Sequence, residues 1–360
     1  GKNIVVMGAG QETTIIDGDG IGSVVTFANN EDSTSVLHGF TIQNGFSSYG
    51  SGINCEDYTS PTLQNLVITG NSASYGGGIS CRNYSNPTLQ NILIAGNSAN
   101  NRGAGVFCNN NSSPKIENVT IVGNYGSNSG GGISVNNNSH PFIMSSILWN
   151  NSPDEIHFFE SEPPNAITVS YSDIQGGQDS IVTNDNGTVT WGSGNIDVDP
   201  KFIDAENDDY HLLASSQLIN AGHPDSTDSD GSIADMGAYP YLNNYSGPTW
   251  YITASGNDTT GTGASGDPFR SIQAGINFSS NTDSVAVAAG TYTENIDFSG
   301  KNIVVIGENR ETTIIDGNQS ESVVKFISGE DSTAVLMGFT ITNGAAENGG
   351  GISLYQSSPG

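Results

Sequence analysis

Basic side chains are scarce in this chain. Nine Lys and Arg residues stand against 37 Asp and Glu residues, which gives a formal net charge of −28 over 360 residues. Because nucleic-acid phosphates are bound by clustered Lys and Arg, this balance excludes a nucleic-acid partner. The same charge repels a polyanionic polysaccharide unless a divalent cation bridges the two. An acidic surface of this kind keeps a protein soluble in a salty, calcium-containing exterior.

Long apolar runs are also missing. No stretch approaches the roughly 20 apolar residues of a transmembrane helix, so we expect no membrane insertion by this segment. Apolar residues make up 34% of the chain and charged residues 13%, while glycine reaches 47 residues. The apolar residues recur at regular positions, which argues against disorder. A fold with a thin core and many turns fits this composition.

A long repeat divides the chain into two copies of one module. Lys2–Gly18 and Lys301–Gly317 lie 299 residues apart, and 13 of their 17 positions are identical. The run EDSTSVLHGFTIQNG at Glu31 recurs with the same offset as EDSTAVLMGFTITNG at Glu330. We therefore expect most of one module and the opening of a second. Further modules are expected in the same chain.

A shorter repeat lies inside the first copy. Its four segments are marked by prolines at steps of 26, 27 and 27 residues: Pro61, Pro87, Pro114 and Pro141. Apolar residues alternate within each segment, as in Ile53 and Cys55, and Gly, Asn, Ser and Pro separate the alternating runs. This pattern indicates short strands with one apolar face. Stacked about 4.8 Å apart, such strands give an all-β solenoid, a parallel β-helix with 26–27 residues per coil.

Three columns of equivalent residues follow from this period. The three cysteines fall in one column, Cys55, Cys81 and Cys108, where parallel stacking is poor geometry for a disulfide. We expect buried free thiols that pack as small hydrophobes. Two asparagine columns are expected at turns, where stacked amides can hydrogen-bond along the axis. These columns are Asn65, Asn91 and Asn118, and Asn71, Asn97 and Asn124.

These residues resemble the pectin-lyase-like right-handed β-helix superfamily, especially its bacterial extracellular proteins with tandem modules. The resemblance covers nearly the whole chain and implies a right-handed helix. The segment from Trp250 is similar to the entrance of such a module, and residues 196–241 are similar to its closing segment. The expected division is residues 1–242 for copy one without its start, 243–248 for a linker, and 249–360 for the opening of copy two.

A short capping helix is expected at the start of the second module. Asp267 is the predicted N-cap and Pro268 the first helical residue, with the helix running to about Phe278. Ile272 and Ile276 would then plug the open end of the solenoid. Such a cap covers strand edges and apolar side chains that would otherwise be exposed.

One surface cluster resembles the sites of lyases in this superfamily. Glu56 and Asp57 should stack beside Arg82 on the next coil. Lyases of the family abstract a proton beside a uronate carboxylate, using Ca²⁺ held by acidic side chains and a basic residue. The resemblance implies Glu56 and Asp57 as calcium ligands and Arg82 as the base. The alternative is an exposed ion pair between adjacent coils, and copy two has Tyr355 and Gln356 at the two acidic positions.

The closing segment offers a second candidate for metal binding. Four acidic residues fall within 11 positions there, Asp225, Asp228, Asp230 and Asp235, with Gly231 following the third. Carboxylates at short spacing around a glycine turn are ligands that Ca²⁺ favours, although the loop is not a complete EF-hand. We predict a structural calcium site here, against a solvated acidic turn. Ca²⁺ is the one cofactor that the sequence suggests.

Two functional hypotheses remain open. The first is a non-catalytic extracellular β-helix that serves as a structural or adhesive stalk, or as a carbohydrate-binding surface, of a large secreted or cell-surface protein. The second is a calcium-dependent polysaccharide lyase or glycoside hydrolase. Tandem copies and the absence of a recognisable catalytic constellation favour the first. The expected partners are polysaccharides or cell-surface glycans, and composition and resemblance together place the protein outside the cell.

Overall fold

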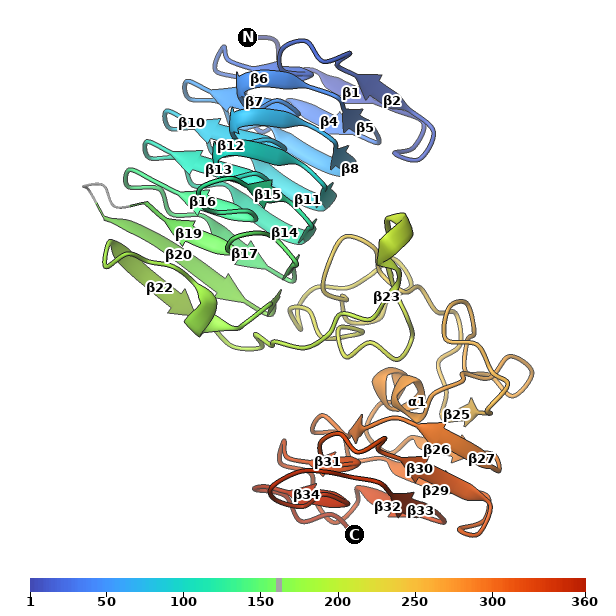
Figure 1. Ribbon diagram of the computed structural model, residues 1–360. Coiled ribbons are helices and arrows are strands. Elements are labelled where there is room, and N and C mark those ends of the chain that lie inside the picture. Colours follow the sequence, from blue (N-terminus) through green and yellow to red (C-terminus); the bar gives the residue numbers. More distant parts are fainter. Residues whose placement is uncertain (160–163) are drawn as a thin grey trace. The chain divides into compact units, whose positions relative to one another are not determined.

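The computed structural model describes residues 1–159 and 164–360, which form two compact units. The first unit contains residues 1–198, 221–227 and 233–240, and the second contains residues 199–220, 228–232 and 241–360. Both units consist mainly of short strands (Figure 1). Within the described ranges, no helix combines the length and the apolar character needed to cross a membrane.

Parallel sheets run along the first unit, and each coil contributes a strand to them. One sheet contains β1 (Val5–Met7), β4 (Val36–His38), β8 (Thr62–Thr69), β11 (Thr88–Ala95), β14 (Lys115–Val122), β17 (Phe142–Met144), β20 (Asn165–Ser170) and β22 (Gly187–Trp191), joined by β2 (Ile15–Asp17), β5 (Thr41–Gln43), β18 (Ile147–Trp149) and β21 (Asp173–Ile174). The second contains β3 (Val25–Phe27), β7 (Ile53–Glu56), β10 (Ile79–Arg82), β13 (Val106–Asn109), β16 (Ile133–Val135) and β19 (Ile156–Phe158). The third contains β6 (Phe46–Tyr49), β9 (Ser72–Tyr75), β12 (Ser98–Arg102) and β15 (Tyr125–Gly126). A 3₁₀ turn, η1 (Gln178–Ser180), follows β21.

The strand register confirms the coil period. Cys81 pairs with Cys55 on one side and with Cys108 on the other, and Cys108 pairs in turn with Val135. All three cysteines are free and have no solvent exposure. The adjacent coils are thus stacked with equivalent side chains in one inward column, and the apolar residues of each coil form a single continuous core.

The inner asparagine column forms a buried hydrogen-bond ladder, as predicted. The Nδ2 atom of Asn71 donates to Oδ1 of Asn97 at 3.0 Å, and Nδ2 of Asn97 donates to Oδ1 of Asn124 at 3.0 Å. Asn151 extends the ladder by accepting from Nδ2 of Asn124 at 2.8 Å. Glu155 ends it by accepting from Nδ2 of Asn151 at 2.6 Å and from the Asn151 amide at 3.0 Å. The ladder pairs buried polar groups that would each be costly if left alone.

The prediction for the outer asparagine column was wrong, because these residues lie within strands and not at turns. There Asn65 contacts His38, and Asn118 donates to the Asp235 carbonyl. Their role is conformational. Asn65, Asn91 and Asn118 lie within β8, β11 and β14 with φ angles of 49°, 54° and 51°, in the left-handed region. Leu63 and Leu66 are both fully buried although three positions separate them. Strict alternation would turn one of the two outward, so a left-handed residue between them restores the inward direction. Asparagine tolerates this conformation better than most residues.

The second unit repeats the opening of the first. Its elements are β23 (Phe202–Asp204), η2 (Ala205–Asn207), β24 (Asp209–Leu212), β25 (Thr249–Ile252), α1 (Ile272–Phe278), β26 (Ser284–Val287), β27 (Gly290–Thr293), β28 (Ile296–Asp297), β29 (Val304–Gly307), β30 (Thr313–Asp316), β31 (Val324–Phe326), β32 (Val335–Met337), β33 (Thr340–Thr342) and β34 (Ile352–Leu354). The strands β29 to β34 stand 299 residues after their counterparts in the first unit, β1 to β5 and β7, within one residue at their ends. The tandem repeat of sequence is therefore a repeat of structure.

The capping helix exists, but its predicted start was wrong. Helix α1 begins at Ile272, with Ser271 as N-cap accepting a hydrogen bond from the Ala274 amide, and it ends at Phe278 as predicted. The segment before it is extended, because Phe269 pairs with β25 through its backbone and its ring is fully buried beside Trp250. Burial of Phe269 thus overrides the local Asp-Pro signal.

Helix α1 contributes to the core through the two isoleucines that were predicted to do so. Ile272 and Ile276 are fully buried in the core of the second unit. Nδ2 of Asn277 donates to the Ala214 carbonyl at 2.9 Å and to the Ser216 carbonyl at 2.6 Å. Residues 199–220 therefore group by contacts with the second unit, whereas the sequence repeat counts them in copy one.

Candidate functional site

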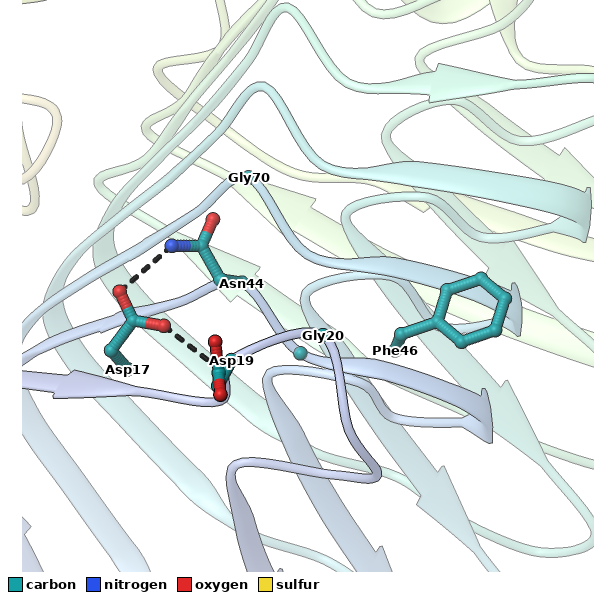
Figure 2. Close-up of a pocket in the computed structure, with 7 residues that line it drawn as sticks. Asp17, Asp19, Gly20, Asn44, Phe46 and Gly70 are labelled. Carbon is teal, nitrogen blue, oxygen red and sulfur yellow. Dashed lines mark hydrogen bonds between the residues drawn. The ribbon is translucent and has the colours of Figure 1, made fainter.

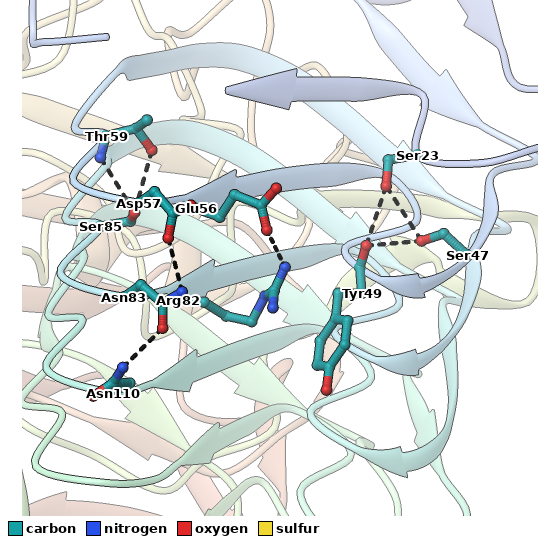
Figure 3. A network of polar contacts seen from close by, with 10 residues as sticks. All are labelled: Ser23, Ser47, Tyr49, Glu56, Asp57, Thr59, Arg82, Asn83, Ser85 and Asn110. Carbon is teal, nitrogen blue, oxygen red and sulfur yellow. Dashed lines mark hydrogen bonds and ion pairs between the residues drawn. The ribbon is translucent and has the colours of Figure 1, made fainter. Parts of the chain in front are cut away.

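The cluster singled out in the sequence lies where β7 and β10 end, and Figure 3 shows it. Arg82 pairs in register with Glu56, and its Nη2 atom forms an ion pair with the Glu56 carboxylate. The guanidinium also lies over the ring of Tyr49, with its central carbon 3.9 Å from the ring centroid. These contacts leave the side chain of Arg82 17% exposed and that of Glu56 28% exposed. Such a cation–π contact combined with an ion pair holds the guanidinium in place.

A second ladder runs beside this pair on the surface. Nδ2 of Asn83 donates to Oδ1 of Asp57 at 2.8 Å, and Nδ2 of Asn110 donates to Oδ1 of Asn83 at 2.8 Å. The three residues share left-handed φ angles of 55–57°. Tyr58 and Tyr84 follow the first two, and their rings stack with centroids 5.1 Å apart. Asp57 is thus part of a turn that recurs from coil to coil.

The chemistry of the cluster follows from these contacts. Glu56 is paired with Arg82, and Asp57 accepts a hydrogen bond from Asn83. The guanidinium already donates to the Glu56 carboxylate and stacks on Tyr49, which opposes the role of a general base. The geometry is that of an interstrand ion pair, which was the alternative interpretation of these residues. Catalysis by this cluster stays a prediction.

The four aspartates of the predicted calcium loop differ in their exposure to solvent. Asp225 and Asp230 are exposed, whereas Asp235 is 2% exposed. Oδ1 of Asp230 accepts from the Ser232 amide at 3.0 Å, and its Oδ2 accepts from the Asn243 amide at 2.7 Å. Although partial burial raises the pKa of Asp230, these hydrogen bonds outweigh it and lower that pKa.

Metal binding by these residues has no further support in the structure. Among the described residues, no group of three or more His, Cys, Asp and Glu side chains is arranged to hold a metal ion. Asp228, which is half-buried, belongs to the same short segment as Asp230. The structural calcium therefore stays a prediction.

A surface depression that sequence reasoning missed lies at the beginning of the first unit (Figure 2). It has a volume of about 640 Å³ and is lined by Asp17, Asp19, Gly20, Asn44, Gly45, Phe46 and Gly70. Oδ2 of Asp17 accepts from Nε2 of Gln43 and from Nδ2 of Asn44, both at 2.8 Å. Hydrogen bonds from Gln43, the Asp19 amide and Asn44 lower the pKa of Asp17. The depression thus combines a fixed anionic acceptor with an exposed aromatic ring.

One signal in the sequence pointed to this depression. The motifs IIDG and NG recur at the same positions of both copies, and in copy two Asn343 donates to both oxygens of Asp316 at 3.0 Å. Phe46 is not repeated, since Ala345 takes its place. The acidic and amide side chains therefore belong to the module, whereas the ring belongs to copy one alone.

A stack of parallel coils with in-register columns defines a parallel β-helix protein. A comparison with protein families supports this fold. The family described as "Right handed beta helix region" matches residues 14–203, which is more than half of the chain. The chain therefore belongs to the right-handed β-helix family. Residues 254–299, which include α1 and β26 to β28, match a second model described as protein of unknown function (DUF1565). No curated protein and no solved structure matches the chain.

Proposed function

We propose that this protein is a rigid, non-catalytic segment of an extracellular stalk built from repeated β-helix modules. The observation that carries the proposal is the buried ladder from Asn71 to Asn151, closed by Glu155. It links successive coils along the axis with hydrogen bonds shielded from water. A rod joined in this way keeps its length when it is pulled, which is what a stalk requires.

Three further features support the stalk. Parts of two copies of the module occur in one chain at an offset of 299 residues, and such tandem repetition is typical of proteins built from many similar units. The side chains that most resemble a lyase site, Glu56, Asp57 and Arg82, contact one another or their neighbours in adjacent coils. The net charge of −28 also fits an exposed, soluble surface outside the cell.

Single-molecule pulling on the whole chain tests the mechanical role. We expect the first unit to unfold at a clearly lower force in Asn97→Ala than in the wild type. Asn100→Ala, which changes an exposed asparagine of the same coil, is the matched control and should leave the force unchanged. Equal forces in all three proteins would contradict the proposal.

Enzyme assays test the competing function. The whole chain is incubated with pectate, alginate and neutral polysaccharides, with and without Ca²⁺, and unsaturated products and reducing ends are measured. The stalk proposal expects no product. Release that disappears in Arg82→Ala would replace it with a lyase acting through this cluster.

A further inference from the structure

The Asp267–Pro268 peptide bond lies in the turn that precedes α1, where the sequence suggested a helix N-cap. The main-chain carbonyl of Asp267 accepts hydrogen bonds from two backbone amides, that of Gly263 at 2.9 Å and that of Thr262 at 3.2 Å. The Thr262 amide also donates to Oδ2 of the Asp267 side chain at 3.1 Å. One N–H group therefore contacts both the carboxyl group and the carbonyl oxygen of the same residue.

The residues that follow this bond are held in place as well. The Pro268 carbonyl accepts from the Asn257 amide at 3.0 Å, and Phe269 pairs with β25 through its backbone. The side chain of Phe269 is fully buried, whereas Asp267 is exposed to water. The peptide bond is thus fixed on both sides, and the carboxyl group beside it stays accessible.

The chemistry of an aspartyl-prolyl bond gives this geometry its importance. A carboxyl oxygen of an aspartate can reach the carbonyl carbon of its own residue and close a five-membered ring, so the nucleophile is always close to its target. Proline supplies a tertiary amide nitrogen without N–H, which accepts a proton more readily than that of an ordinary peptide bond. Two N–H donors aimed at a carbonyl oxygen stabilise the negative charge that develops there during the attack.

A second aspartyl-prolyl bond in the same unit, Asp199–Pro200, lacks this arrangement. Oδ1 of Asp199 accepts from the Lys201 amide at 3.0 Å. Over residues 1–159 and 164–360, the main-chain carbonyl of Asp199 accepts no hydrogen bond from a backbone amide. The chain therefore contains an internal comparison, with the same dipeptide in two surroundings.

We propose that the chain cleaves itself at the Asp267–Pro268 bond. One oxygen of the protonated Asp267 carboxyl group attacks the main-chain carbonyl carbon of the same residue, while the amides of Thr262 and Gly263 stabilise the oxyanion. The bond from this carbon to the Pro268 nitrogen breaks, the carboxyl proton passes to that nitrogen, and a cyclic anhydride of Asp267 remains. Water then opens the anhydride, so the net reaction is hydrolysis of one peptide bond. This activity goes beyond the stalk function and does not depend on it.

The reaction should accelerate as the pH falls from 7 to 5, because the reacting carboxyl group must carry its proton. Tyr241 and Asp258 are titratable neighbours of this turn. Burial, together with the charges of Asp258 and Asp267, raises the pKa of Tyr241, so its phenol stays neutral over this range. The Tyr241 hydroxyl donates to the Gly261 carbonyl at 2.6 Å. The Asp267 carboxyl group is therefore the proton donor of the reaction.

The two products should stay together after cleavage. Strand β25, which precedes the bond, pairs in parallel with β26, which follows it. Phe269 remains bridged to Ile252 of β25, and residues from both sides of the bond share one core. The cut should therefore be visible only under denaturing conditions.

Incubation of the whole chain at pH 5, 6 and 7 tests the proposal, with denaturing gels and intact masses recorded over several days. We expect fragments of residues 1–267 and 268–360, formed at pH 5 at least about tenfold faster than those cut at Asp199–Pro200. In urea at the same pH the two bonds should be cut at similar rates, because the hydrogen bonds to the Asp267 carbonyl are lost. Native size-exclusion chromatography should show one species before and after the cut.

Two variants remove the reacting groups. Asp267→Asn keeps the shape of the side chain without its acid, Pro268→Ala replaces the leaving group, and both should leave the chain intact. Asp199→Asn is the matched control and should not change the rate at Asp267, while circular dichroism checks that all variants fold. The proposal fails if the folded chain stays intact at pH 5, if it is cut equally fast at both bonds, or if Asp267→Asn is cut as fast as the wild type.

Discussion

Nδ2 of Asn97 donates to Oδ1 of Asn124 at 3.0 Å, while Oδ1 of Asn97 accepts from both the backbone and the side-chain amide of Asn71. Asn97 is 1% exposed, so all of these bonds form away from water. Asn97→Ala leaves several buried groups without partners and should lower the free energy of unfolding by about 2–4 kcal/mol. Chemical denaturation measures this, and the exposed Asn100→Ala should cost under about 0.5 kcal/mol. Equal losses in the two variants would contradict the role of the ladder.

The left-handed conformation of Asn91 leads to a second prediction, which concerns the stability of two variants at this position. Its φ is 54° within β11, and its side chain is exposed. Asn91→Val places a β-branched residue in a conformation that crowds its Cβ, and we expect a loss of about 1–2 kcal/mol in unfolding free energy. Asn91→Gly removes the side chain without that strain and should remain within about 0.5 kcal/mol of the wild type. A valine variant as stable as the glycine variant would show that the backbone there is free to change.

Because the three stacked cysteines are buried, we expect their thiols to be protected from chemical modification in the native protein. Burial raises the pKa of Cys55, Cys81 and Cys108, and none of the three is exposed. Because the thiolate is the reactive form, a thiol reagent such as dithionitrobenzoate at pH 8 should label none of them in the native protein. In denaturant all three should react. Fast labelling of the native protein would mean that the coils open locally.

Glu155 makes the stability of the first unit depend on pH. Burial raises its pKa to about 7, partly opposed by the hydrogen bonds from Asn151. A carboxyl group whose pKa is higher in the folded state favours folding most when it is protonated. Its contribution is therefore complete below its ordinary pKa of 4.5 and is lost as the pH rises through about 7.

Glu155→Gln should remove this loss. Melting temperatures measured by calorimetry at pH 5 and pH 8 should differ less in this variant than in the wild type. Glu294 in the second unit has a pKa also raised to about 7 by burial, so part of the pH dependence should persist. Glu12→Gln, at an exposed position, is the control and should behave as the wild type. A Glu155→Gln variant with the full wild-type pH dependence would refute the assignment.

The coil architecture could be predicted from the sequence because the fold is a repeat. Steps of 26 and 27 residues between prolines forced equivalent residues into columns, and the column of Cys55, Cys81 and Cys108 formed as expected. The helix start was missed because capping signals are local. Asp267 and Pro268 fit a helix N-terminus, but the tertiary burial of Phe269 keeps this segment extended.

The depression was harder to predict than the coils. Asp17 and Asn44 lie 27 residues apart on adjacent coils, and only the stacking of these coils brings Asn44 to within hydrogen-bond distance of Asp17. Exposed rings carry no periodic signal: Phe46 pairs with Ser72 on the next coil, and Tyr125 pairs with Ser98 and Ser152 on its two neighbouring coils. A comparison of the two copies could have drawn attention to Phe46, because Ala345 replaces it.

The in-register stacking of Cys81 between Cys55 and Cys108 also bears on how such a protein changes during evolution. Each of these coils pairs through this column with the coil before it and the coil after it. Loss or duplication of one whole repeat would therefore disturb a single junction and preserve all other pairings. Genetic insertions and deletions of 26 or 27 residues could lengthen or shorten the rod in increments of about 4.8 Å, without a new fold having to arise.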